Sequence, residues 1–100
     1  MAALRPNILL IITDSQRYDT IAALGNPIIK TPSLNRVARE GTSFTSAFTP
    51  SPMCVPARCA LLFGQYPSRS GCYDNVTGMP TDGRSSFVGT LGESGYRTHL

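Results

Sequence analysis

The feature that most constrains the fold is an unbroken aliphatic run near the start of the sequence. Residues 8–12 are all Ile or Leu, and Asp14 follows the run after one threonine. A short run that is apolar at every position is typical of a parallel strand buried on both faces, so we predict a strand over residues 7–13. Ligands in open α/β sheets gather at the carboxyl ends of strands. Asp14 is therefore either an ordinary turn residue or a ligand-binding residue.

The rest of the chain alternates between helical and extended patterns, which indicates an α/β fold. A proline near the start and a glycine at the end mark the first two of three helices. We predict helices over residues 31–41, 56–63 and 87–93. We predict further strands over residues 42–49 and from residue 95 onward, with loop over most of residues 65–86.

The pentapeptide Cys-Val-Pro-Ala-Arg at residues 54–58 carries the most chemistry. Pro56 suits the first position of a helix, which places Cys54 just before the first turn. Unpaired N–H groups and the helix dipole favour an anion there, and Arg58 can reach the same place from one turn on. From the residues alone, Cys54 is either a buried structural thiol or a thiolate nucleophile.

Composition and charge argue against several classes of partner. The net charge is +3, but the basic residues are scattered and form no cluster of the kind that binds nucleic acid. The aliphatic run is too short to span a membrane and is a poor signal peptide. Three cysteines suit a reducing compartment, so we expect a cytoplasmic protein in which Cys59 and Cys72 are packing residues.

The pentapeptide and the Leu-Leu-Phe-Gly segment at residues 61–64 resemble the signature of type I sulfatases, and the resemblance spans residues 6–100. It implies an alkaline-phosphatase-like α/β fold with a mostly parallel central sheet, with residues 1–100 as the N-terminal part of one catalytic domain. It also implies that a formylglycine-generating enzyme converts Cys54 to Cα-formylglycine, whose hydrated aldehyde is the nucleophile. Ala57, in place of the usual serine, is similar to the choline-sulfatase-like and phosphonate-monoesterase-like branches.

The resemblance assigns roles to Asp14, Cys54 and Arg58. Asp14 is expected to bind a divalent cation together with an oxygen of residue 54, with Ca²⁺ the first expectation and Mn²⁺ the alternative. Ser15 stands where many sulfatases carry a second aspartate. Arg58 is expected to offset negative charge on the nucleophile and on the bound anion.

A second segment, Tyr-Asp-Asn at residues 73–75, follows the pentapeptide. From composition alone it is a turn. It is also similar to a segment of choline-sulfatase-like enzymes, which implies that Asn75 forms a hydrogen bond with a substrate oxygen.

These features together favour hydrolysis of a small-molecule sulfate ester. One alternative is a phosphonate monoester or phosphodiester hydrolase that uses the same nucleophile. Another is a non-catalytic anion-binding module, which would keep Arg58 at the helix start but leave Cys54 unmodified. Whether the protein forms a homo-oligomer stays open.

Overall fold

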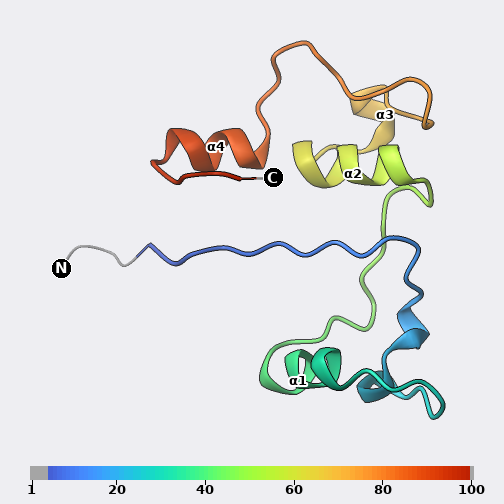
Figure 1. Cartoon of the computed structure of the whole chain (residues 1–100). Helices are drawn as coiled ribbons and strands as arrows, with labels where there is room; N and C mark the ends of the chain where they lie inside the picture. Colours follow the sequence, from blue (N-terminus) through green and yellow to red (C-terminus); the bar gives the residue numbers. More distant parts are fainter. Residues whose placement is uncertain (1–4, 100) are drawn as a thin grey trace. The chain divides into compact units, whose positions relative to one another are not determined.

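The computed structural model describes residues 5–99, and the chain forms two compact units, residues 1–45 and 46–100. The first unit contains the short 3₁₀ helices η1 (Tyr18–Thr20) and η2 (Ala22–Leu24) and the helix α1 (Pro32–Glu40). The second unit contains α2 (Cys54–Phe63), α3 (Pro67–Ser70) and α4 (Phe87–Glu93), which are labelled in Figure 1. No described helix is both long enough and apolar enough to cross a membrane.

Polar contacts fix the first unit around α1. The Thr31 hydroxyl accepts a hydrogen bond from the Ala22 N–H at 2.9 Å, and the Asn35 side chain accepts one from the Ala23 N–H at 2.8 Å. Thr31 also donates to Asn35 at 2.9 Å. These contacts satisfy N–H groups at the start of η2, where a helix has no internal acceptors, and they hold η2 against α1.

In the second unit, α2 packs against both α3 and α4. The buried apolar residues of this unit, among those described, are Pro56, Cys59, Ala60 and Cys72, so the prediction that the two cysteines are packing residues is confirmed. Gly64 ends α2 in the left-handed conformation, with φ of 63°. This agrees with its predicted role as a helix stop, because glycine adopts that conformation without strain.

Two of the helix predictions hold closely, and one needs correction. The helix over residues 87–93 is confirmed, and the Ser86 hydroxyl caps it by accepting from the Gly89 N–H at 3.0 Å. The helix near residues 31–41 is confirmed as α1. The third helix begins at Cys54 rather than at Pro56. Proline is tolerated throughout the first turn, where its missing N–H has no acceptor in any case, so it does not mark the first residue.

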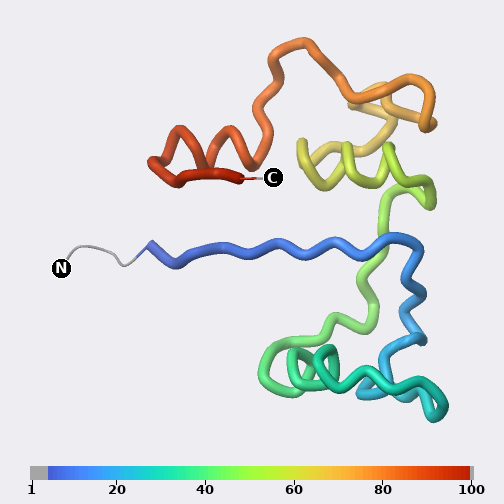
Figure 2. Tube along the Cα trace, in the orientation of Figure 1, coloured from blue at the N-terminus to red at the C-terminus, as the bar shows by residue number. Residues whose placement is uncertain are grey.

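The predicted strands are absent from residues 5–99, so the mostly parallel sheet is not formed there. Figure 2 shows residues 7–13 as an elongated trace, and the side chain of Leu9 is 84% exposed. Residues 42–49 form bends and turns, with Phe48 91% exposed. An apolar pattern favours a strand, but a strand needs a neighbour to pair with its N–H and C=O groups, and no described segment pairs with these.

The predicted strand at Gly95 is also wrong. Gly95 has φ of 86° and donates its N–H to the Gly92 carbonyl at 2.9 Å. It therefore terminates α4, as glycine commonly does after a helix, instead of starting a new extended segment. The short helix α3 lies within residues that we predicted to be mostly loop, and Pro67 in its first turn is the signal that marks it.

Candidate functional site

The start of α2 is the candidate site, and Asn75 contacts it from 20 residues further along the chain. The Val55 N–H donates to the Asn75 side-chain oxygen Oδ1 at 3.0 Å. Met53, at the N-cap position, makes no side-chain cap of its own. Asn75 thus serves as an N-cap brought in by tertiary structure, since asparagine oxygens are well suited to first-turn N–H groups. Through this hydrogen bond, Asn75 contacts the residue that directly follows Cys54 in the chain.

Among the other backbone N–H groups described in the first turn of α2, only that of Cys54 is left to donate to a ligand. Pro56 has no N–H, and the Ala57 N–H donates to the Met53 carbonyl at 3.0 Å. Within residues 5–99, no acceptor is seen for the Cys54 N–H, and the Cys54 side chain is exposed. Because the N-terminus of a helix carries partial positive charge, this turn favours an anion beside residue 54.

A tight turn holds Asn75 in position. The Asp74 carboxylate accepts hydrogen bonds from the Val76 N–H at 2.9 Å and from the Thr77 hydroxyl at 2.7 Å. The bonds from Thr77, followed by that from Val76, hold the pKa of Asp74 below its usual value. Asp74 therefore forms the turn that its sequence favours. Among the described residues, none accepts a hydrogen bond from the Asn75 amide nitrogen. Both N–H groups of this nitrogen can therefore donate to a ligand.

Arg58 lies one turn after Cys54 on the same helix. Residues four apart share a helix face, so the two side chains emerge from the same side of α2. The Arg58 side chain is half-buried. The structure thus brings together Cys54, Arg58 and Asn75, the three predicted site residues of the second unit, although their chemical roles stay predictions.

Asp14 belongs to the first unit, at an exposed bend that follows the aliphatic run. Ser15 after it has φ of 53°, the only positive φ at a non-glycine position in the described part of the chain. Among residues 5–99 no three His, Cys, Asp or Glu side chains converge on one point. A carboxylate is the kind of ligand that Ca²⁺, Mg²⁺ and Mn²⁺ prefer. Asp14 can supply one ligand, and its pairing with residue 54 stays a prediction.

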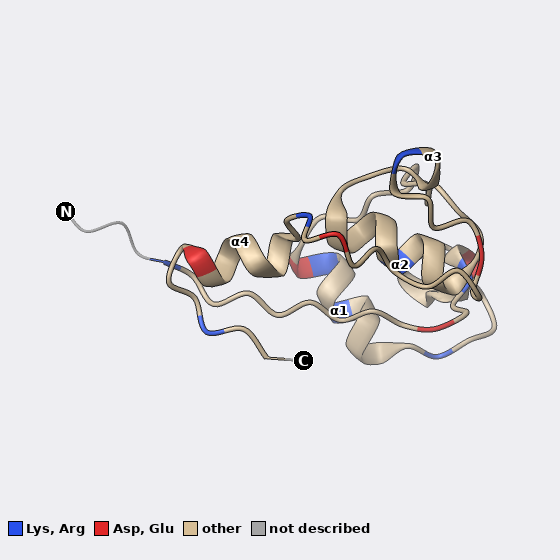
Figure 3. Ribbon diagram, turned by 90° about the horizontal axis from the view of Figure 1, so that it is seen from above, with Lys and Arg blue, Asp and Glu red and all other residues tan. Residues whose placement is uncertain are grey.

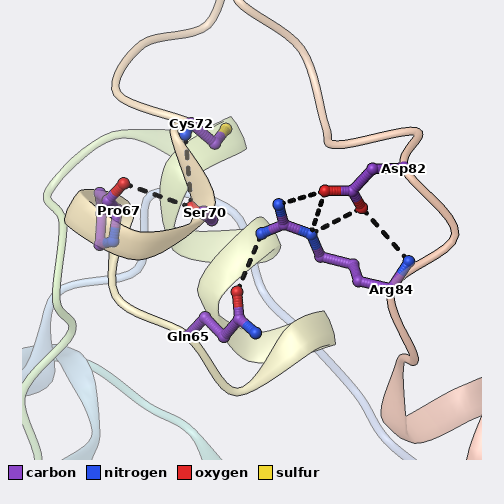
Figure 4. Close-up of polar contacts among 6 residues, drawn as sticks. All are labelled: Gln65, Pro67, Ser70, Cys72, Asp82 and Arg84. Atoms are coloured by element: carbon purple, nitrogen blue, oxygen red, sulfur yellow. Dashed lines mark hydrogen bonds and ion pairs between the residues drawn. The ribbon is translucent and has the colours of Figure 1, made fainter.

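The sequence did not predict a second polar cluster, which lies at the C-terminal end of α2. It consists of Gln65, Asp82 and Arg84 and is called the polar clamp below. The Arg84 guanidinium donates to the Gln65 side-chain oxygen at 2.9 Å and to the Asp82 carboxylate at 2.8 Å, as Figure 4 shows. The Arg84 side chain is only 21% exposed. Asp82 and Arg84 lie two residues apart, which is a local signal for pairing, but the contact to Gln65 is not local. Figure 3 shows that charged residues elsewhere are spread over several elements.

The polar clamp should make the free energy of unfolding depend on pH. Hydrogen bonds from Arg84 lower the pKa of Asp82 from 3.8 to about 2. The folded state therefore favours the ionised carboxylate, and this contribution is complete above pH 3.8 and is lost as the pH falls through about 2. We expect the difference in Tm between the wild-type protein and Asp82→Asn to shrink between pH 5 and about pH 2. A difference that does not change with pH would contradict this assignment.

Comparisons with known proteins agree on one family. Residues 6–100 match the family model of the sulfatases. The chain is 38% identical to bovine arylsulfatase A and 36% identical to human steryl-sulfatase, in each case over 99% of its length. It is 37% identical to an ulvan-active sulfatase of Formosa agariphila over 81% of its length. No solved structure matches the chain. The chain spans 20%, 19% and 16% of the lengths of these three relatives.

Proposed function

Because the chain belongs to the sulfatase family, we propose that it is the N-terminal part of a catalytic domain that hydrolyses a small-molecule sulfate ester. The observation that carries the proposal is the hydrogen bond from the Val55 N–H to Asn75, which brings an amide donor beside Cys54. In the alkaline-phosphatase-like α/β fold of this family, residues 7–13 would become a strand of a mostly parallel sheet by pairing with strands outside the described residues. The exposed aliphatic side chains of this segment support that expectation.

Cys54 is the proposed nucleophile after a formylglycine-generating enzyme has oxidised it to formylglycine. Hydration of the aldehyde gives two hydroxyl groups on one carbon. One hydroxyl loses its proton and attacks the sulfur, and the bond from sulfur to the substrate's alcohol oxygen breaks. The second hydroxyl then loses its proton, which restores the aldehyde and expels sulfate. The chain needs no second nucleophile for this cycle.

The surroundings of residue 54 suit the charge that develops on the sulfate oxygens. The N–H of residue 54 and the Asn75 amide nitrogen supply hydrogen-bond donors, and Arg58 supplies a positive charge on the same helix face. Donors that are already in position stabilise a developing oxyanion without reorganising during the reaction. Asn75 is neutral, so it orients the anion without changing the net charge of the site.

Asp14 is the proposed metal ligand of this segment. A divalent cation, Ca²⁺ in the first place and Mn²⁺ in the second, would supply Lewis-acid stabilisation of oxyanions when bound. One carboxylate and one oxygen of residue 54 are fewer ligands than either cation takes, so we expect carboxylates from outside this segment to supply further ligands. Asp14 would supply one of the oxygen ligands of the cation.

We expect Asp14→Asn to weaken metal binding and turnover together, because one formal negative charge leaves the metal's ligand shell. The measurement is metal content by mass spectrometry of the dialysed full-length protein, alongside turnover of an aryl sulfate. Asp19→Asn is the matched control, since Asp19 is an exposed carboxylate of the same unit that pairs with Arg17. Full metal content in Asp14→Asn would remove Asp14 from the site.

The substrate class can be tested by comparing kcat/KM for an aryl sulfate and for a phenylphosphonate monoester. We expect the full-length enzyme with formylglycine at position 54 to prefer the sulfate ester. A preference for the phosphonate would favour the alternative hydrolase. No turnover of either ester by fully modified protein would favour an anion-binding module.

A further inference from the structure

The segment that carries Asn75 is attached to both ends of α2. It runs over residues 65–84 and is called the capping segment below. Near its middle, the Asn75 side chain accepts a hydrogen bond from the Val55 N–H at 3.0 Å, at the N-terminal end of α2. At its end, the Arg84 guanidinium donates to the Gln65 side-chain oxygen at 2.9 Å, just beyond the C-terminal end of α2. The 10 residues of α2 span about 15 Å, so the capping segment covers the length of the helix and returns.

Packing fixes the first half of the capping segment. The helix α3 packs against α2, and Cys72, which follows α3, is 1% exposed. The Cys72 N–H donates to the buried Ser70 hydroxyl at 3.3 Å, as Figure 4 shows. These contacts hold the chain in place as far as Cys72, which lies three residues before Asn75.

The second half of the capping segment depends on the polar clamp. Beyond the turn at Asp74, no hydrogen bond within the described part of the chain holds residues 78–81. The next fixed point is Arg84, whose side chain is 21% exposed and donates to both Asp82 and Gln65. Hydrogen bonds from a charged donor are stronger than those between neutral groups. The polar clamp therefore closes the half of the capping segment that packing does not fix.

We propose that Arg84 is a positioning residue of the candidate site, because its bond with Gln65 closes the capping segment and holds Asn75 against the start of α2. The effect on turnover rests on the proposed function, whereas the effect on the bond between Val55 and Asn75 does not. Arg84 is bound at the opposite end of α2, so it acts through Asn75. An amide donor helps the reaction only during the time that it is in place, so kcat should follow that fraction.

The size of the effect follows from two hydrogen bonds. A helix cap favours the bound position of Asn75 about fivefold over displaced positions. Loss of a hydrogen bond from a charged donor shifts such a balance about tenfold. Without the bond between Arg84 and Gln65, Asn75 would hold the Val55 N–H about a third of the time instead of about five-sixths.

Hydrogen exchange at the Val55 amide, followed by NMR, measures the position of Asn75 without any substrate. Gln65→Met removes the acceptor for Arg84, keeps the side-chain length and leaves Arg84 paired with Asp82. In the full-length protein we expect the Val55 N–H to exchange about fourfold faster in Gln65→Met than in the wild type. Gln65→Glu keeps an acceptor oxygen and should restore the wild-type exchange rate. Equal exchange rates in Gln65→Met and the wild type would overturn the proposal.

Steady-state kinetics on an aryl sulfate tests whether the position of Asn75 affects the reaction. We expect Gln65→Met and Arg84→Met to lower kcat about two- to threefold, with a smaller change in KM, because Asn75 acts on charge that develops in the transition state. A purely structural role of the polar clamp would lower the Tm and leave kcat unchanged. Arg69→Gln is the matched control, since Arg69 is an exposed arginine of the same segment, and it should keep wild-type kinetics.

A double variant shows whether Arg84 acts through Asn75. Arg84→Met should have no further effect on kcat when Asn75 is already alanine, because the donor that it positions is gone. An equal fall in kcat in both backgrounds would overturn the positioning role. If the fully modified wild-type protein hydrolysed no ester, the proposed function would fail, and the exchange rate of the Val55 N–H would still decide whether Arg84 holds Asn75 in place.

Discussion

Replacing Cys54 by alanine should abolish turnover of sulfate esters. Alanine can form neither the aldehyde nor its hydrate, so no oxygen nucleophile remains at the start of α2. The Cys54 side chain is exposed and contributes little packing, so the fold should persist. The measurement is kcat on an aryl sulfate, with circular dichroism and Tm as checks on folding. We expect activity at the background rate and a Tm close to that of the wild-type protein.

Cys72→Ala provides the matched comparison, because it removes a buried thiol of the same unit without touching the proposed nucleophile. It should lower the Tm, since a packed side chain is lost, and leave kcat much higher than in Cys54→Ala. Wild-type kcat in Cys54→Ala would overturn the mechanism.

Asn75→Ala should have the second-largest effect, with a loss of about 10²–10³ in kcat. The substitution removes the amide donor proposed to act on the sulfate oxygens. It also removes the acceptor for the Val55 N–H, and loss of a helix cap costs about 0.5–2 kcal/mol of stability. Steady-state kinetics and thermal unfolding measure the two effects separately. Val76→Ala is the control, because the Val76 side chain next to Asn75 is 93% exposed.

Asn75→Asp separates the two roles of the residue. Aspartate keeps an oxygen for the Val55 N–H, so stability should stay near that of the wild-type protein. It offers no N–H donor and adds a negative charge beside the anion, so kcat should fall at least as far as in Asn75→Ala. Wild-type kinetics in both variants would remove Asn75 from the site. Wild-type stability in Asn75→Ala would show that the cap contributes nothing.

Local signals in the sequence predicted the helices well. The helix predicted over residues 87–93 is confirmed as α4, and the Ser86 hydroxyl at its N-cap position satisfies a first-turn N–H group. Gly64 predicted the end of α2 because it adopts a positive φ without strain. The start of α2 was misplaced by two residues, since proline is accepted at several positions of the first turn.

Long-range features were not predictable in the same way. The aliphatic run over residues 7–13 has the composition of a buried strand, but a strand depends on partner segments that the pattern does not identify. The family resemblance singled out Asn75 as a substrate contact. It gave no indication that Asn75 caps α2, because that bond depends on how the turn at Asp74 meets a helix 20 residues earlier. The contact of Arg84 with Gln65 was missed for the same reason.

The most direct test of the central claim is the mass of the tryptic peptide 40–58, which contains Cys54. The full-length protein should be produced together with a formylglycine-generating enzyme, digested without reduction, and compared with the same protein produced without that enzyme. We predict that co-production converts residue 54 to formylglycine or its hydrate and that aryl sulfate turnover rises in proportion to the modified fraction. An unmodified cysteine at position 54 in a preparation with full turnover would contradict the account.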